Sequence, residues 1–253
     1  MTENTYLYGR NPLQEALLAK KRGQVLSIEQ LLLTKTAEED PAIMSLVQSN
    51  NLDYKIVTVA EIESLIGRGA VHQGVCALLN EKELYTPLED VLAKAAAKEN
   101  LGKKSVFVLL DELQDPHNVG AIIRSAVAFG ADAILIPDHD QTQITGTVIK
   151  TSSGMTFAIP IVRIGNVNTI LTKLKEQKFW VYGLTGNGDS KLHTTKFDAN
   201  AIIIIGSEGE GIRPKTLELC DFKLSIETSK LCESLNASNA AAVVLHEWYT
   251  QNN

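Results

Sequence analysis

The chain has 253 residues, and 24 Lys and Arg against 30 Asp and Glu give it a formal net charge of −6. Its 44% hydrophobic and 21% charged content is typical of a globular protein with one large or two smaller domains. No stretch approaches the roughly 20 apolar residues of a membrane span, and the N-terminus lacks a signal-peptide hydrophobic region. Three widely spaced cysteines without metal-ligand spacing favour a reducing compartment. We therefore predict a cytoplasmic protein with no membrane partner and no metal.

The first 80 residues alternate helical and strand patterns, which predicts a small α/β domain with its own core. Asn11 is placed to cap a helix that begins at Pro12, because proline is favoured at the first helical position. A second helix is expected to start at the acidic stretch before Pro41. Strands are predicted at Ile28–Leu33, Lys55–Val59 and Val75–Leu79.

Residues 81–104 are predicted to connect this domain to a second one. Within them, Thr86 opens a capping-box pattern, with Pro87 at the first position of an Ala- and Lys-rich helix. Over residues 105–253 the pattern changes to continuous apolar strands separated by helices. Such strands are buried on both faces, which predicts an α/β domain with a mostly parallel sheet. The predicted strands are Val106–Leu110, Ala133–Ile136, Ile159–Arg163, Phe179–Gly183, Ala201–Ile205 and Phe222–Ile226.

A polar loop follows the first of these strands and leads into a helix predicted to begin near Asn118. Apolar residues from Val119 onward recur at the spacing of a core-facing helical stripe. Arg124 lies off that stripe, one helical turn after Gly120, so its guanidinium has open space along the helix flank. By itself this pattern also fits a capped helix with an ordinary surface arginine.

Three glycines follow the most apolar strand, in the sequence GSEGEG at residues 206–211. Glycine lets the backbone approach a ligand closely, and this loop lies where open α/β sheets bind ligands. The spacing differs from the dinucleotide fingerprint and from the phosphate loop, and Glu208 and Glu210 disfavour a phosphate cradle. A plain glycine-rich turn is the alternative interpretation.

The last predicted strand runs into a polar loop and then into a terminal helix. Either Ser234 or Asn236 is placed to cap that helix. Its first turns are rich in alanine and other small residues, which would permit unusually close packing. On its own, this pattern is that of an amphipathic C-terminal helix.

In their order and spacing, the three loops resemble the signature motifs of the SpoU family, also called the TrmH family, of RNA 2′-O-ribose methyltransferases. The matching segments read NVGAIIR at 118–124, GSEGEG at 206–211 and SLNASNAAA at 234–242. Two further segments, YGRNPL at 8–13 and AVHQGV at 70–75, resemble the start and end of the family's RNA substrate-binding domain. The resemblance spans nearly the whole chain. Its two-domain form is most similar to enzymes that methylate a guanosine in 23S rRNA.

The resemblance implies a homodimer, a SPOUT-type catalytic domain over 105–253 with a C-terminal trefoil knot, and a substrate-binding domain over 1–80. It implies 23S rRNA as the partner, rather than DNA, and S-adenosyl-L-methionine as the cofactor. By motif, the cofactor contacts fall at Gly206, Ile226 and Leu235, and the catalytic residues are Arg124, Asn118, Glu208, Ser234 and Asn236. An arginine side chain stays protonated, so we expect Arg124 to orient the 2′-hydroxyl and stabilise its developing charge. A deprotonated Arg124 acting as base is the alternative.

One motif departs from the family pattern, which usually opens Ile-Pro-Met-x-Gly where this chain has IETSK at 226–230. A proline and a glycine are thus replaced by Glu227 and Lys230. A cofactor held through backbone groups would tolerate the change, whereas a loosened loop would bind it more weakly. Two alternative functions therefore stay open: the same chemistry on tRNA, and a non-catalytic RNA-binding or ribosome-assembly relative.

Overall fold

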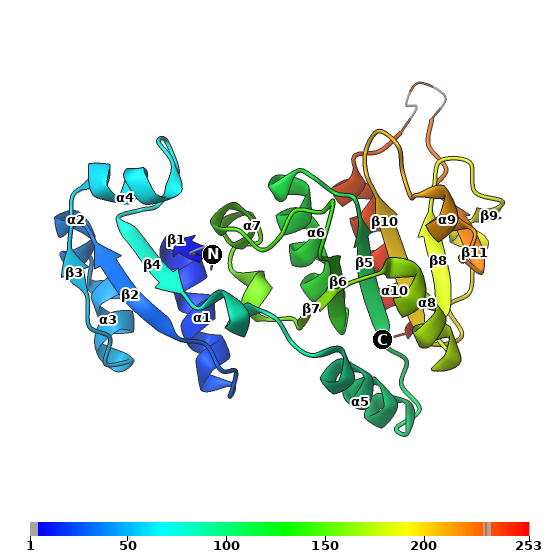
Figure 1. Cartoon of the computed structure of the whole chain (residues 1–253), viewed down its shortest axis with the longest axis horizontal. Helices are drawn as coiled ribbons and strands as arrows, with labels where there is room; N and C mark the ends of the chain where they lie inside the picture. The colour runs from blue at the N-terminus through cyan, green and yellow to red at the C-terminus, as the bar shows by residue number, and fades with distance from the viewer. Residues whose placement is uncertain (1–4, 230, 232–233, 253) are drawn as a thin grey trace. The chain divides into compact units, whose positions relative to one another are not determined.

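The computed structural model describes residues 5–229, 231 and 234–252, which form two compact units. Unit 1 comprises Met1–Tyr85 together with Ile144–Ala158, and unit 2 comprises Thr86–Gln143 and Ile159–Asn253. Each unit is built around its own β-sheet and carries its own helices (Figure 1). The predicted α/β class is confirmed.

Unit 1 contains a four-stranded sheet and short helices. Its strands are β1 (Thr5–Tyr8), β2 (Ile28–Leu33), β3 (Lys55–Ile56) and β4 (Val75–Leu79). Their order is β1-β4-β2-β3; β4 is antiparallel to both neighbours, and β2 and β3 are parallel. Its helices are α1 (Arg10–Lys21), α2 (Lys35–Glu38), α3 (Pro41–Ser49), α4 (Val59–Ile66) and α7 (Gly146–Thr151), with 3-10 turns η1 (Glu81–Leu84) and η2 (Met155–Phe157).

Helix α1 begins two residues earlier than predicted. The structure has Gly9, and not Asn11, at the N-cap position, with a φ of 96° that favours glycine. The Arg10 N–H donates to the side-chain oxygen of Gln73 at 3.2 Å. The helix therefore starts directly after β1, because a neighbouring loop accepts its first N–H and Gly9 makes the sharp turn.

A segment from the second half of the chain, residues 144–158, belongs to unit 1. It carries α7, which packs against β1, and η2, which packs against α1. Gly146 lies so close to the Tyr6 carbonyl that a Cβ atom there would overlap it. The chain thus leaves unit 2 after Gln143 and returns to it at Ile159. Sequence patterns had placed all of residues 105–253 in one domain.

Unit 2 contains a seven-stranded sheet in which every neighbouring pair is parallel. Its strands are β5 (Val106–Asp111), β6 (Ala133–Pro137), β7 (Ile161–Ile164), β8 (Trp180–Leu184), β9 (Ser190–Lys191), β10 (Ala201–Gly206) and β11 (Phe222–Ser225). The spatial order is β7-β6-β5-β10-β8-β11-β9. All six predicted strands are present, and the prediction of a mostly parallel sheet is confirmed.

Helices cover both faces of this sheet. They are α5 (Leu88–Glu99), α6 (Pro116–Ala128), α8 (Val167–Glu176), α9 (Pro214–Leu217) and α10 (Ala237–Asn252), with the 3-10 turn η3 (Leu192–Thr194). Phe107 and Leu109 of β5 share a buried cluster with Val91 of α5 and Leu171 of α8. Successive strand residues point to opposite faces, so Val108 faces the other layer, where α6 and α10 pack together. Among the described residues, no helix is both long enough and apolar enough to cross a membrane.

Two predicted helix starts in unit 2 are corrected by the structure. Helix α5 begins at Leu88 after Pro87, and Thr86 makes no side-chain cap; its N–H donates to the Ile161 carbonyl at 2.7 Å, which holds it beside β7. Helix α6 begins at Pro116, two residues before Asn118, because the Asp115 carboxylate accepts the His117 N–H at 2.8 Å. Asn118 is therefore inside the first turn, and its side chain is available for other contacts.

The two described cysteines, Cys76 and Cys220, lie in separate units and are free thiols. Burial raises the pKa of each thiol to about 12, so both stay protonated near neutral pH. Cys76 is fully buried as expected for a small hydrophobic residue, and Cys220 is half-buried. Cys232 lies outside the described residues.

Candidate active site

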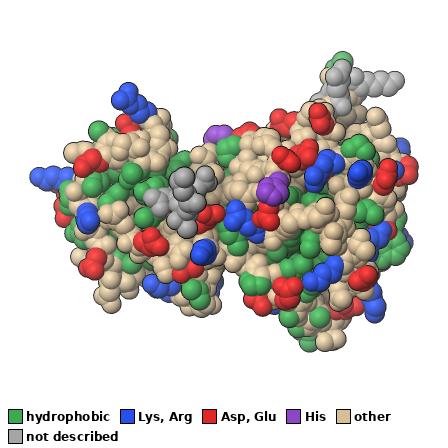
Figure 2. Space-filling model, viewed as in Figure 1, with side chains coloured by type: hydrophobic (Ala, Val, Ile, Leu, Met, Phe, Trp, Pro, Cys, Tyr) green, Lys and Arg blue, Asp and Glu red, His purple; other side chains and the backbone are tan. Residues whose placement is uncertain are grey.

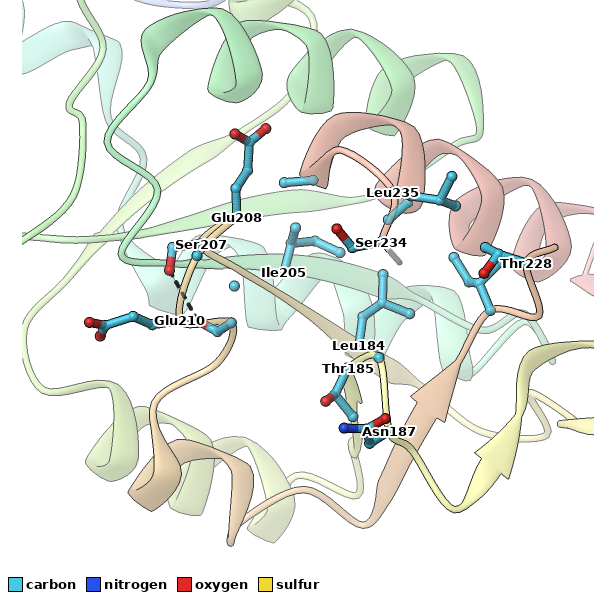
Figure 3. A pocket seen from close by; sticks show the side chains of 17 residues that line it. Leu184, Thr185, Asn187, Ile205, Ser207, Glu208, Glu210, Thr228, Ser234 and Leu235 are labelled. Carbon is cyan, nitrogen blue, oxygen red and sulfur yellow. Dashed lines mark hydrogen bonds between the residues drawn. The ribbon is translucent and has the colours of Figure 1, made fainter. Parts of the chain in front are cut away.

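A cavity of about 380 Å³ lies at the carboxyl edge of the parallel sheet in unit 2. It is bordered by the ends of β8 and β10 and by the segment that follows β11, which is where α/β sheets bind ligands. In Figure 3, Leu184 and Ile205 lie near the middle of the view, Leu235 lies beside the start of the C-terminal helix, and Glu208 and Glu210 extend outward from their loop. The cavity therefore has an apolar floor and an acidic rim.

The loop after β10, residues 206–211, forms one wall of this cavity. Ser207 and Gly211 exchange two backbone hydrogen bonds of 3.1 Å, which close the loop on itself. A Cβ atom on Gly206 would overlap the Gly211 carbonyl and the Ile212 nitrogen. Gly211 has a φ of 74°, in the region that favours glycine. Both glycines are required for this closed shape, as a glycine-rich turn would also need, and the position of the loop along the cavity is what favours a ligand-binding role.

Asp111 contacts the chain on both sides of this loop, at Gly206 and at Arg213. It is fully buried at the end of β5 and pairs in register with Gly206 at the end of β10. Its carboxylate accepts three hydrogen bonds from Arg213, from the backbone N–H at 3.0 Å, Nε at 2.9 Å and Nη2 at 2.6 Å. Arg213 Nε also lies 3.4 Å from a carboxylate oxygen of Glu112. Sequence patterns did not single out Asp111 or Arg213, and an acidic residue at the end of a buried apolar strand is the signal that was present.

Replacing Asp111 with asparagine is expected to lower the free energy of unfolding by about 3 kcal/mol, because it removes one partner of a buried ion pair. This is the low end of the usual range, since the Arg213 side chain is 38% exposed. The control is Asp132→Asn, whose carboxylate pairs with Lys98 at 2.9 Å but is 26% exposed, and about 1 kcal/mol or less is expected there. Urea unfolding measures both, and equal losses would contradict this role of burial.

Three predicted polar residues from different motifs meet at one point. Asn118 Nδ2 donates to Glu208 Oε1 at 2.9 Å, and Asn236 Nδ2 donates to Asn118 Oδ1 at 2.9 Å. Asn236 Nδ2 also donates to Glu208 Oε1, which completes a triangle. Asn236 Oδ1 accepts the Ser238 N–H at 2.9 Å and so caps α10, which decides between the two predicted caps.

The remaining predicted residues divide between the cavity and its surroundings. Gly206, Ile226 and Leu235, the positions matched to cofactor contacts, all line the cavity, together with Glu208 and Ser234. Asn118 and Asn236 reach it only through Glu208. Arg124 is exposed on α6 and is not among the lining residues. A single chain thus assembles the cavity and the triangle without bringing Arg124 to them.

The segment from Leu184 to Asn187, which follows β8, forms a second cavity wall that sequence analysis did not identify. Its position at the carboxyl end of a buried strand was the available signal. The described lining residues include two glutamates and no lysine or arginine. This charge distribution disfavours a phosphate ligand and suits a neutral or positively charged one.

Comparison with known proteins identifies the family. Residues 105–246 match the model of the SpoU rRNA methylase family, and residues 6–85 match that of RNA 2′-O ribose methyltransferase substrate binding. The chain belongs to the SpoU family of RNA methyltransferases. A TrmH family tRNA/rRNA methyltransferase of Staphylococcus aureus (strain MSSA476) is 31% identical over 252 residues, covering 97% of this chain and 95% of the relative. For the TrmH family protein YacO of Bacillus subtilis (strain 168), the identity is 31% over 251 residues, with 99% and 97% covered.

Solved SpoU structures share the whole fold. The SpoU methyltransferase AviRb of Streptomyces viridochromogenes, crystallised with AdoMet, superposes with a TM-score of 0.80 at 22% identity, covering 98% of this chain and 90% of that chain. An AdoMet-bound rRNA methyltransferase of Sinorhizobium meliloti gives a TM-score of 0.76 at 21% identity, with 98% and 88% covered. The two-unit SpoU architecture is therefore common to proteins of low sequence identity.

Proposed function

We propose that this SpoU protein transfers a methyl group from S-adenosylmethionine to the 2′-hydroxyl of a guanosine in 23S rRNA. The observation that carries the proposal is the cavity at the carboxyl edge of the sheet. Residues of two of the three motifs line it, including all three positions matched to cofactor contacts, and Asn118 of the remaining motif bonds to Glu208 at its rim.

The cavity suits S-adenosylmethionine in size and chemistry. Its volume of about 380 Å³ is within the range of small-molecule sites. Leu184, Ile205 and Leu235 offer an apolar surface for the adenine ring, and the acidic rim favours a ligand with a sulfonium charge. Gly206, Ile226 and Leu235 would hold it mainly through the backbone. When bound, the cofactor supplies an electrophilic methyl group; the trefoil knot implied for this region stays a prediction.

The protein's own residues would orient the RNA ribose. Arg124 has a planar guanidinium that stays charged, so it would hold the 2′-hydroxyl and its neighbouring phosphate and stabilise the alkoxide character that develops as the proton leaves. The triangle of Asn118, Glu208 and Asn236 fixes the loop beside which this oxygen must lie. Ser234 adds a hydroxyl at the cavity wall. Holding the hydroxyl in line supplies much of the rate enhancement.

A homodimer would explain the position of Arg124. It is exposed on α6, away from the cavity of its own chain, so it is placed to serve the cavity of a second copy. The layer formed by α6 and α10 also exposes apolar side chains, with Val243 at 42% and Tyr249 at 41%. Phe129, just after α6, contacts the His246 ring at a centroid distance of 5.3 Å. Such a surface favours burial against a partner subunit.

The choice of 23S rRNA rests on unit 1 and on the resemblance of the two-domain form to RlmB, the bacterial 23S rRNA guanosine methyltransferase. A separate substrate-binding unit offers contacts beyond the catalytic pocket, which favours a large structured RNA as the substrate. The net charge of −6 argues against broad phosphate binding, and acidic and basic side chains are intermingled on the face in Figure 2. Recognition would therefore depend on shape and on local basic groups.

Methyl transfer from labelled S-adenosylmethionine to separate unmodified 23S rRNA, 16S rRNA and tRNA tests the choice of substrate. We expect label in 23S rRNA alone, released on digestion as 2′-O-methylguanosine. Label confined to tRNA would favour the same chemistry on tRNA. No transfer to any RNA, together with no cofactor binding, would favour a non-catalytic RNA-binding relative, the function that the IETSK departure at 226–230 leaves open.

A further inference from the structure

Glu227 occupies the position at which the SpoU motif usually has proline, and it is the side chain between two cavity-lining residues. Ile226 precedes it and Thr228 follows it, and both line the cavity. A loop in this place must keep a fixed path if backbone groups are to hold a ligand. Without the proline ring, some other contact has to restrain it.

Both carboxylate oxygens of Glu227 are engaged by basic side chains. Oε1 lies 2.6 Å from Lys191 Nζ, and Oε2 lies 3.1 Å from His193 Nδ1. The hydrogen bond and charge of Lys191 hold the pKa of the Glu227 carboxyl below its ordinary value, so the carboxylate is ionised near neutral pH. All three side chains are more than half exposed, so dissolved salt can screen their attraction.

These basic residues belong to the chain that continues from the second cavity wall. After Leu184–Asn187 the chain passes Gly188, where a Cβ atom would overlap the Lys223 carbonyl, and forms the edge strand β9. This strand pairs with β11 through only two residue pairs, the last being Ser225 with Lys191. The backbone pairing of β9 with β11 ends at Ser225. The contacts of Glu227 with Lys191 and His193 extend the connection between these two segments by two further residues.

We propose that Glu227 is a positioning residue whose ion pair with Lys191 and contact with His193 hold the two cavity walls, residues 184–187 and 226–228, in a fixed relative position. This clamp takes over the restraint that proline provides elsewhere in the family, and it makes cofactor affinity sensitive to ionic strength. The inference rests on the proposed function, because it takes S-adenosylmethionine as the ligand of the cavity.

Titration calorimetry of the full-length protein with S-adenosylmethionine tests the clamp through Glu227→Gln, Lys191→Gln and the double variant. Exposed ion pairs are weak, so we expect each single variant to raise Kd about two- to fivefold at about 20 mM salt. The double variant should lose about as much affinity as Glu227→Gln alone, because Lys191 has no ion pair with residue 227 left to break once the carboxylate is gone. At about 500 mM salt the ratio of variant to wild-type Kd should fall toward one.

Lys173→Gln is the matched control, since Lys173 pairs with Glu89 at 3.2 Å on an exposed surface and neither residue lines the cavity. It should follow the wild type at both salt concentrations, and all variants should melt within about 2 °C of the wild type. Wild-type affinity for Glu227→Gln at low salt, or an equal loss at both salt concentrations, would overturn the clamp alone. Failure of the wild type to bind the cofactor at all would overturn the proposed function and the clamp with it.

Discussion

Replacing Gly206 with alanine is expected to weaken S-adenosylmethionine binding by about 10- to 100-fold. The added Cβ would overlap the Gly211 carbonyl and the Ile212 nitrogen, so the closed loop over 206–211 has to open. Overpacking of this kind costs about 1–3 kcal/mol, and Gly206 and Gly211 both line the cavity. Titration calorimetry measures the loss directly.

Gly209→Ala is the matched control for this substitution. Gly209 lies in the same loop, but a Cβ atom there meets nothing within 4 Å. We expect its cofactor affinity to stay within a few-fold of the wild type, about 1 kcal/mol at most. If both substitutions weakened binding equally, the tight approach at Gly206 would not be what shapes the cavity.

Replacing Arg124 with alanine is expected to reduce kcat for RNA methylation by about 100- to 1000-fold, the range seen when one donor to a developing oxyanion is removed. Cofactor affinity should be unchanged, because the proposed contacts of Arg124 are with the ribose 2′-hydroxyl and its neighbouring phosphate and not with the cofactor. Its exposed position also predicts a small effect on folding stability, within about 0.5 kcal/mol. Single-turnover methylation at saturating cofactor measures the chemical step.

Arg124→Lys separates charge from geometry at this position. Lysine keeps the positive charge but lacks the planar fork, so we expect most of the activity to be lost here too. Full activity in the lysine variant would show that charge alone is sufficient. Equal activity of Arg124→Ala and the wild type would remove Arg124 from the proposed mechanism.

The sheet of unit 2 was predictable because its strands are continuous apolar runs. Ile202 to Ile205, for example, are all buried, as is typical of a strand covered on both faces. Strand β9 was not predictable, since two polar residues, Ser190 and Lys191, carry no periodic signal and form a strand only because β11 lies beside them. The helix start at Arg10 was misplaced for a similar reason, since a contact with the distant Gln73 decides it. The start at Pro116 did have a local signal, the capping residue Asp115 directly before a proline.

The assignment of residues 144–158 to unit 1 had no signal in the sequence. Its basis is packing against β1 and α1, which are distant along the chain. The site was predictable in part, because its motifs are local. That Asn118 would meet Glu208, 90 residues later, depended on the order of strands in the sheet. The anchoring of the loop by Asp111 and Arg213 likewise appears only once β5 and β10 are neighbours.

The position of the transferred methyl group shows whether this protein is a ribose 2′-O-methyltransferase. The protein would be incubated with total unmodified RNA and S-adenosylmethionine that carries a deuterated methyl group, and the RNA digested to nucleosides for mass spectrometry. We expect deuterium on the ribose, at the 2′-oxygen, and none on a base. Deuterium on a base, or unlabelled RNA from a protein that binds the cofactor, would contradict this function.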